Sequence, residues 1–316
     1  MSKRVAPRFG IGEWYGHSFA RLASEQRTDL AKIALSHTKQ NAPPCPFLSK
    51  TASIPCTKKG GICSLRLYES LEGGNAKPLE DEYGKLRVVC PHRFKQNDTI
   101  YSVVAQQLIN TENPVIVPEV RFLRRKQAGA FILEGEKTSV DQSSEDVGNI
   151  DIVLVNTDGP ELKWCALEIQ AVYFSGEKMN SLFAHIENFV GEGIPFPDKV
   201  RRPDYRSSGP KRLMPQLQIK VPTLRRWGKK MAVIVDVPWF RTNVVGVDTV
   251  SNISNCDIAW FLIDFDESTN PATLIVTGAQ LHTLENAVDG LTGGFPVTLE
   301  EFESKIRDKM TRTSRS

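Results

Sequence analysis

The sequence predicts an α/β protein, in which a mixed sheet core flanked by helices follows an N-terminal, loop-rich subdomain with four cysteines. Three observations predict it. Beyond residue 96, helical and strand periodicities mix in the order α–β–β–α–β. Four of the six cysteines fall in one segment where prolines and glycines cluster. The length of 316 residues fits two domains of roughly 100–200 residues each. We therefore divide the chain into residues 1–95 and 96–316.

The sequence disfavours membrane-spanning proteins, secreted proteins and ATP-driven motors. No apolar run approaches the roughly 18–20 residues that cross a bilayer, and residues 1–16 contain no apolar stretch of a secretory signal. We expect a soluble, cytoplasmic protein. The nucleotide-binding motif G-x-x-x-x-G-K-[ST] is absent from the sequence, so ATP-driven movement along a polymer has no visible basis.

The N-terminal part predicts few regular elements. Spaced apolar residues in 16–38 predict one or two helices, whereas the fading periodicity of 42–93 predicts loops. Asn97 or Asp98 can cap a helix. Its apolar face would consist of Ile100, Val103, Val104 and Leu108.

The C-terminal part predicts the sheet. Strands are expected at 114–123 (interrupted at Pro118), 149–156, 162–172, 231–237, 258–265 and 273–278. The second and third form a hairpin around Asp158-Gly159. A helix from Glu177 would bury Met179, Leu182, Phe183, Ile186, Phe189 and Val190. A capping box from Thr298 to Glu301 predicts a last helix, with Phe302, Ile306 and Met310 directed inward.

Positive charge is concentrated in one segment. Eleven basic residues and one acid lie between Lys199 and Lys230, which gives +10 in 32 residues of a chain whose net charge is +3. A polyanion favours this segregation, because each neutralised phosphate releases counterions. Nucleic acid is therefore the favoured partner, and a solvated basic face is the alternative. The candidate DNA-binding residues are Arg201, Arg202, Arg206, Lys211, Arg212, Gln216 and Lys220.

The clustered cysteines indicate a metal site or a set of unrelated buried thiols. They are Cys45, Cys56, Cys63 and Cys90. A disulfide framework would need an oxidising compartment, whereas a metal can order a segment with few core residues. Four thiolates suit Zn²⁺ or a single iron, and residue identity does not distinguish them. His92 could replace one ligand, but a surface histidine is the simpler interpretation. Cys165 and Cys256 are read as core residues.

An acidic group accompanies the predicted hairpin. Asp151 is a charge in an apolar strand, and strand alternation places Glu168 and Gln170 on one face of the next strand while the odd positions fill the core. Two adjacent carboxylates repel unless a cation lies between them, and oxygen ligands beside a phosphate substrate favour Mg²⁺. Glu119 is a further candidate acid, with an exposed strand-end glutamate as the alternative.

These residues resemble a known family. A D…E-x-K/Q pair on adjacent strands looks like the active site of PD-(D/E)XK nucleases, and the more specific likeness is to type II restriction endonucleases of the NotI/EagI type. It covers roughly residues 40–240. The matching segments are CPF (45–47), Cys56, GICS (61–64), CPHRF (90–94), NIDIVLV (149–155), EIQAVYFSG (168–176) and YRSSGPKRLMPQLQIK (205–220).

The resemblance implies a site and a function. It implies a structural iron held in rubredoxin-like fashion by the four cysteines, and Asp151, Glu168 and Gln170 as Mg²⁺-dependent catalytic residues. Gln170 departs from the usual lysine, so another cation, such as Lys178 or Lys220, would compensate. The likeness also implies a PD-(D/E)XK-like domain at 96–316 that cleaves double-stranded DNA at a short, palindromic, GC-rich site.

Further partners follow from such an enzyme, and two other functions remain open. A palindromic site matches a homodimer, and a restriction enzyme implies a cognate DNA methyltransferase in the cell. The alternatives are a metal-stabilised DNA-binding protein without catalysis and a structure-specific DNA repair nuclease.

Overall fold

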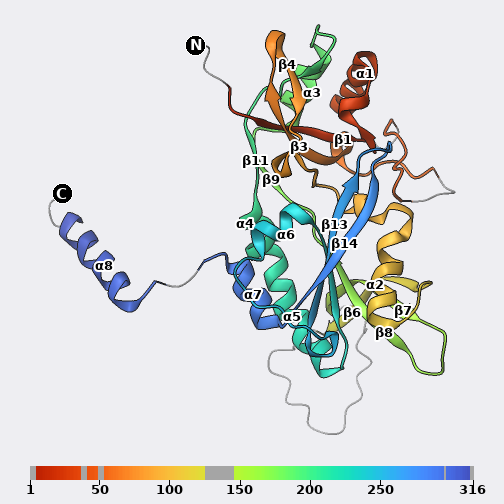
Figure 1. The fold of residues 1–316 in the computed structure, drawn as a ribbon, viewed down its shortest axis with the longest axis vertical. Helices are drawn as coiled ribbons and strands as arrows, with labels where there is room; N and C mark the ends of the chain where they lie inside the picture. The colour runs from red at the N-terminus through yellow and green to blue at the C-terminus, as the bar shows by residue number, and fades with distance from the viewer. Residues whose placement is uncertain (1–4, 37–40, 49–52, 125–145, 295–296, 314–316) are drawn as a thin grey trace, which may run out of the picture.

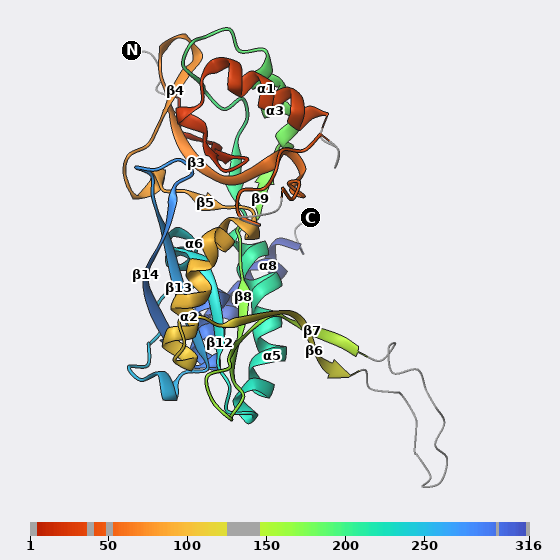
Figure 2. The ribbon, with the colours of Figure 1, turned by 90° about the vertical axis from the view of Figure 1, so that its right-hand side faces the viewer.

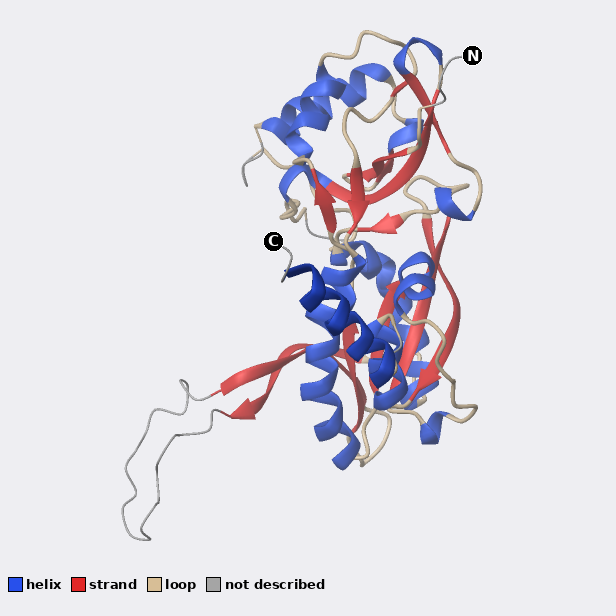
Figure 3. Cartoon of the chain, turned by 90° about the vertical axis from the view of Figure 1, so that its left-hand side faces the viewer, coloured by secondary structure: helices blue, strands red, loops and turns tan. Residues whose placement is uncertain are grey.

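Two sheets organise the chain along its long axis (Figures 1 and 3). The computed structural model describes residues 5–36, 41–48, 53–124, 146–294 and 297–313. The first sheet has the strand order β10-β4-β3-β1-β2, with β5 also paired to β3. The second has the order β14-β13-β12-β8-β7-β6. This mixed architecture confirms the predicted α/β class.

The first sheet is built around two long antiparallel strands, β1 (Arg8–Trp14) and β3 (Ile62–Ser70). The shorter strands are β2 (His17–Ser18), β4 (Asn75–Pro78), β5 (Arg87–Val88) and β10 (Ile194–Pro195). β3 lies where the sequence predicted loops, and that prediction is wrong. Two of its buried residues are polar: Ser64 donates a hydrogen bond to Glu13, and Arg66 donates one to Glu267. The strand therefore has no regular hydrophobic pattern that the sequence could reveal.

Helices α1 (Ser24–Leu35) and α3 (Met179–Glu187) complete this first lobe (Figure 2). Phe183 of α3 stacks on Trp14 with ring centroids 5.5 Å apart. The predicted amphipathic helix is therefore confirmed, but it packs on the lobe formed mainly by residues before 95. Val190 was predicted to be buried and is fully exposed, because α3 ends at Glu187.

The second sheet contains the strands predicted for the C-terminal part. They are β6 (Val115–Arg124), β7 (Asp146–Asn156), β8 (Lys163–Ile169), β12 (Met231–Asp236), β13 (Ile258–Asp266) and β14 (Thr273–His282). β8, β12 and β13 are parallel, whereas the other neighbours are antiparallel. Pro118 does not end β6: it pairs with Ile152, and the ladder resumes after Glu119, whose φ is +52°.

Helices cover both faces of this sheet (Figures 1 and 2). α2 (Thr99–Ile109) packs on one face. α5 (Met214–Arg226), α6 (Val237–Asn243) and α7 (Leu284–Thr292) pack on the other. Even positions of β8 such as Ala166 are consequently as buried as the odd ones, so the predicted one-sided core was incomplete.

A connecting segment links α3 to α5. It contains β11 (Arg201–Pro203), the short helix α4 (Tyr205–Ser208), and one π-helical turn at Gly209–Leu213 that leads directly into α5. β11 pairs with β9 (Phe174–Gly176), which comes just before α3 in the sequence. The predicted basic segment thus runs from the first lobe into the helix that covers the second sheet.

The last helix, α8 (Leu299–Thr313), extends from the body (Figure 1). Thr298 Oγ1 accepts a hydrogen bond from the Glu301 amide at 3.2 Å, as the capping box predicted. The inward packing of this helix was wrongly predicted, because its apolar residues meet no core: Phe302, Ile306 and Met310 are 56%, 43% and 66% exposed. No helix in the described ranges is long and apolar enough to cross a membrane.

Candidate active site

Asp151 and Glu168 lie side by side on neighbouring strands. Ile152 of β7 pairs with Leu167 of β8, so the antiparallel register places Asp151 opposite Glu168 at the end of the ladder. Asp151 is exposed, whereas Glu168 is only 2% exposed beneath helix α5. The hairpin thus brings together the two carboxylates that the sequence singled out.

Lys220 of α5 reaches both carboxylates. Its Nζ donates a hydrogen bond to Glu168 Oε1 and lies 3.5 Å from Asp151 Oδ1. Burial raises the pKa of Glu168 to about 7; Lys220 opposes this rise and Asp151 adds to it. A second contact holds the ammonium in place, since it donates to Gln216 Oε1 at 2.9 Å. The site therefore contains two carboxylates and one ammonium.

The two carboxylates line a cavity of about 360 Å³. Gln170, Tyr173, Arg212 and Gln216 also line it, together with Lys58, Val89 and Pro91 from the cysteine segment. This volume is in the lower range of ligand sites, roughly 300–1,000 Å³. Another cavity, of about 520 Å³, has an apolar lining that includes Trp164 and Trp227 and contains no carboxylate, so it does not resemble a cation site.

Gln170 follows β8 and is held by its backbone. Its backbone N–H donates to Ile234 O at 2.9 Å, and its side-chain amide donates to Ala171 O. Lys178 precedes α3 and, among the described residues, forms no ion pair with either carboxylate. Lys220 contacts both, so it is the predicted substitute cation that the fold brings to the carboxylates. Glu119 is exposed on β6 and does not line the cavity.

The predicted DNA-binding residues separate into buried and exposed groups. Arg201 is 2% exposed and donates to Asp198 Oδ1 and Ser181 Oγ, each at 3.0 Å, so it braces the first lobe. Lys220 is buried in the carboxylate site. Gln216 is half-buried beside it. The exposed members are Arg202, Arg206, Lys211 and Arg212.

Arg212 connects the exposed group to the cavity. It donates to the Tyr173 hydroxyl at 2.8 Å, and its guanidinium lies 3.9 Å from the centre of the Tyr173 ring. Both residues line the cavity. The basic segment therefore runs up to the carboxylates at this end.

The four clustered cysteines are all buried, and backbone pairing joins them two by two. The Cys45 amide donates to Ile54 O at 2.8 Å and the Cys56 amide donates to Pro43 O at 2.9 Å. These hydrogen bonds place the two cysteines on adjacent, paired segments of the backbone. The Cys90 amide donates to Cys63 O at 3.2 Å. Burial raises the pKa of the Cys56 thiol, and the nearby Cys45 and Cys90 raise it further.

The thiols are free, and two point at backbone carbonyls: Cys56 Sγ lies 3.7 Å from Lys58 O and Cys63 Sγ 3.7 Å from Gly61 O. Among the described residues, no group of three or more His, Cys, Asp or Glu side chains is arranged to hold a metal ion. The metal at the cysteines and the Mg²⁺ at the carboxylates thus stay predictions. Burial lowers the pKa of His92, next to this cluster.

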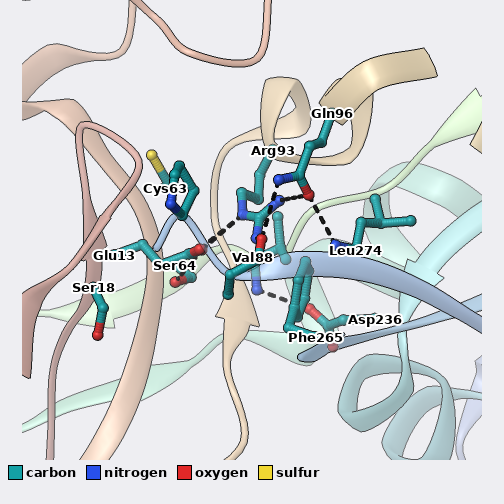
Figure 4. A network of polar contacts seen from close by, with 12 residues as sticks. Glu13, Ser18, Cys63, Ser64, Val88, Arg93, Gln96, Asp236, Phe265 and Leu274 are labelled. Carbon is teal, nitrogen blue, oxygen red and sulfur yellow. Dashed lines mark hydrogen bonds and ion pairs between the residues drawn. The ribbon is translucent and has the colours of Figure 1, made fainter. Parts of the chain in front are cut away.

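A buried polar network joins the cysteine segment to the second sheet (Figure 4). Arg93 Nε donates to both Glu13 carboxylate oxygens at 3.0 and 2.8 Å, and Arg93 also donates to Ala272 O. The Val88 amide donates to Asp236 Oδ2 at 2.8 Å. These contacts hold the strand before Cys90 against the end of the second sheet.

The sequence did not predict Lys58 or Tyr173 as site residues. Tyr173 lies three residues beyond Gln170, so its proximity could have been suspected from spacing. Lys58 belongs to the other lobe and reaches the cavity because the Val172 amide donates to Val88 O at 2.8 Å, which joins the two segments. That contact is long-range and has no local sequence signal.

Comparison with known proteins gives a family match. No curated protein matches the chain. The family model described as restriction endonuclease NotI matches residues 29–276, which is well over half of the chain and includes both the cysteine segment and the carboxylate site. The chain therefore belongs to the NotI restriction endonuclease family.

Proposed function

We propose that this restriction endonuclease is a type II enzyme that hydrolyses phosphodiester bonds of double-stranded DNA, with Mg²⁺, at a short palindromic and GC-rich site. The observation that carries the proposal is that Asp151 and Glu168 line one cavity, that Lys220 contacts both carboxylates, and that the basic segment borders the same cavity. Membership of the NotI family supplies the substrate, DNA.

The carboxylates fit a divalent cation. Asp151 and Glu168 offer adjacent oxygen ligands, the donor type that Mg²⁺ prefers, and their mutual repulsion is relieved by a positive charge. When bound, Mg²⁺ polarises a phosphodiester and lowers the pKa of an attacking water. Lys220 supplies a fixed positive charge beside the phosphate position, and Gln170 offers a neutral amide to orient a water.

The sheet supports a PD-(D/E)XK-like catalytic domain. The two acids come from an antiparallel hairpin whose second strand is parallel to β12, and helices cover both faces. In this arrangement helix α5 carries the cation, while the position two residues after Glu168 carries Gln170. We propose that Lys220 replaces the usual catalytic lysine.

The cysteines fit one structural ion. Cys45, Cys56, Cys63 and Cys90 are four buried thiols held by two backbone pairings, and a tetrahedral thiolate site for iron or zinc needs such a donor set. The ligands would be deprotonated on binding, and the bound cation would offset the cost that burial imposes on the Cys56 and Cys90 thiolates. In this proposal the ion stabilises the segment and takes no part in hydrolysis.

A palindromic site implies an enzyme with two-fold symmetry, so we propose a homodimer, located in the cytoplasm alongside a cognate DNA methyltransferase. Sedimentation of the protein with a DNA duplex that carries the site gives the stoichiometry. Two chains per duplex support the homodimer, and one chain per duplex contradicts it.

The deciding experiment incubates long duplex DNA with the protein, with and without Mg²⁺. We expect discrete fragments with Mg²⁺ and none in excess EDTA. Asp151→Ala and Glu168→Ala should abolish cleavage but keep DNA affinity, while Glu161→Ala, an exposed acid in the hairpin turn, should cleave normally. Binding without cleavage by the wild type would indicate a DNA-binding protein, and nicking at mismatches would indicate a repair nuclease.

A further inference from the structure

We propose that Lys58, from the cysteine segment, is a phosphate-binding residue of the catalytic cavity. The proposal rests on the proposed function of that cavity. It assigns a second ammonium to the site, contributed by the lobe opposite to the one that carries Asp151 and Glu168.

The first observation is the position of Lys58. It lines the same cavity as Asp151, Glu168 and Gln170, although it lies 93 to 112 positions before them in sequence. Its Nζ donates to Val89 O at 2.8 Å, a contact that fixes the end of the flexible side chain. An ammonium has three protons, so this contact leaves donors for a phosphate oxygen.

The second observation is charge compensation. The Lys220 ammonium is paired with Glu168 and Asp151, so two carboxylates already balance it. Lys58, in contrast, has no carboxylate within ion-pair distance in the part of the chain that the structure describes. Lys58 also lies near the Cys56 and Cys90 thiols, which belong to the neighbouring cysteine cluster. A half-buried ammonium on the cavity wall without a carboxylate partner attracts an anion, and the anion of this reaction is the phosphodiester.

The third observation is how the main chain holds Lys58. It follows Cys56 by two residues, its carbonyl lies 3.7 Å from Cys56 Sγ, and its ammonium contact, Val89, precedes Cys90. The two cysteine pairings therefore set the position of Lys58 relative to the carboxylates. In a purely structural role Lys58 would only tie Val89 to its own segment, and the experiment below separates this role from phosphate binding.

The experiment compares Lys58→Met, Lys58→Arg and the matched control Lys59→Met, whose lysine is the exposed neighbour. Cleavage of long duplex DNA is measured under single-turnover conditions with Mg²⁺. Loss of a preorganised charge at the reacting phosphate should slow Lys58→Met by about 10²-fold. Lys58→Arg keeps the charge and should cleave at least about tenfold faster than Lys58→Met. Lys59→Met should cleave at the wild-type rate.

A second readout needs no cleavage. DNA affinity is measured without Mg²⁺ over a range of salt concentrations, and Lys58→Met should lower the log–log slope by about 0.9, the value for one lost phosphate contact. Unfolding temperature and metal content of each variant serve as structural readouts, and both should match the wild type.

Two results overturn the proposal. One is a Lys58→Met variant with the wild-type cleavage rate and the wild-type salt slope. The other is an equal loss of cleavage rate in Lys58→Met and Lys58→Arg that parallels a fall in unfolding temperature, which would show a structural role. Failure of the proposed function is distinguishable, because the wild type would then bind DNA without cutting it. In that case the salt slope still decides whether Lys58 contacts phosphate.

Discussion

Lys220 donates a hydrogen bond to Glu168 across 52 residues of sequence, and the same ammonium lies 3.5 Å from Asp151. Helix α5 thereby delivers a cation to a strand whose own sequence places a neutral glutamine two residues after the glutamate. The charge that the strand lacks is restored by packing, since Lys220 is buried where α5 covers the sheet. This relationship leads to the first two predictions.

The first prediction concerns pH. Burial raises the pKa of Glu168 to about 7, so the carboxyl is protonated below that pH and cannot bind a cation. We expect the single-turnover cleavage rate to fall about tenfold for each pH unit below 7, because only the ionised form is active. Higher Mg²⁺ should move the midpoint to lower pH, since the cation competes with the proton. A midpoint near the ordinary glutamate value of about 4.5, insensitive to Mg²⁺, would contradict this assignment.

The second prediction concerns Lys220 itself. Lys220→Met removes the charge that lowers the pKa of Glu168, so the midpoint of the pH–rate profile should rise above that of the wild type. The maximal rate should drop by about 10²–10³-fold, as expected for the loss of a charge at the reacting phosphate. Lys199→Met changes a lysine of the same basic segment outside the cavity and serves as control. An unshifted midpoint would show that the charge of Lys220 does not control the ionisation of Glu168.

The third prediction tests which basic residues meet DNA. Arg206 and Lys211 are exposed, so Arg206→Ala and Lys211→Ala should each lower the log–log salt slope by about 0.9 if they contact phosphates of B-DNA. Arg201→Ala should act on stability instead, because its guanidinium is buried against Asp198 and Ser181. Lys32→Ala, on α1 and outside the basic segment, provides the control. Unchanged slopes in both exposed variants would place them away from DNA.

The fourth prediction concerns the network that joins the lobes. Arg93 is fully buried, bonded to Glu13, and lies 4.6 and 4.4 Å from the rings of Phe47 and Phe265. Arg93→Ala would leave the Glu13 carboxylate buried without its partner, which costs about 3–5 kcal/mol of unfolding free energy. Arg241→Ala breaks an exposed pair with Glu82 and should cost at most about 1 kcal/mol.

Denaturant unfolding measures both variants. The double variant Glu13→Leu/Arg93→Met should recover part of the loss, because no unpaired charge remains. A loss below about 1 kcal/mol in Arg93→Ala would show that water or another group satisfies Glu13.

The sequence predicted the second sheet better than the first for a physical reason. Strands such as β12 and β13 are buried on both faces and read as continuous apolar runs, whereas β3 hides Ser64 and Arg66 in ion pairs and hydrogen bonds with distant residues. Asp151 and Glu168 could be predicted as neighbours because strand alternation and a hairpin are local rules.

Tertiary contacts were beyond such rules. Lys58 reaches the cavity from the other lobe, and α3 packs on the first lobe although it follows the hairpin in sequence. The capping box of α8 was visible in the sequence, but the solvent exposure of Phe302 was not, because amphipathic spacing alone does not reveal whether a partner surface is present.

The last prediction concerns the cysteines. Each of the four is buried, and burial raises the pKa of Cys56 and Cys90, so thiolates there need a compensating cation. We expect about one tightly bound metal ion per chain. Iron would give a coloured protein through thiolate-to-iron charge transfer, whereas zinc would not, because its d shell is filled. Elemental analysis and the visible spectrum decide between them.

Cys56→Ser should release the ion and make the segment around 42–93 sensitive to protease, because the metal supplies part of its folding free energy. Cys165→Ser is the matched control: Cys165 is buried in β8 among apolar residues, so its replacement should leave the metal content unchanged. Slow removal of the ion by a chelator should reproduce the protease sensitivity in the wild type. Full metal content in Cys56→Ser, or wild-type protein free of metal, would refute the site and leave the four thiols as ordinary core residues.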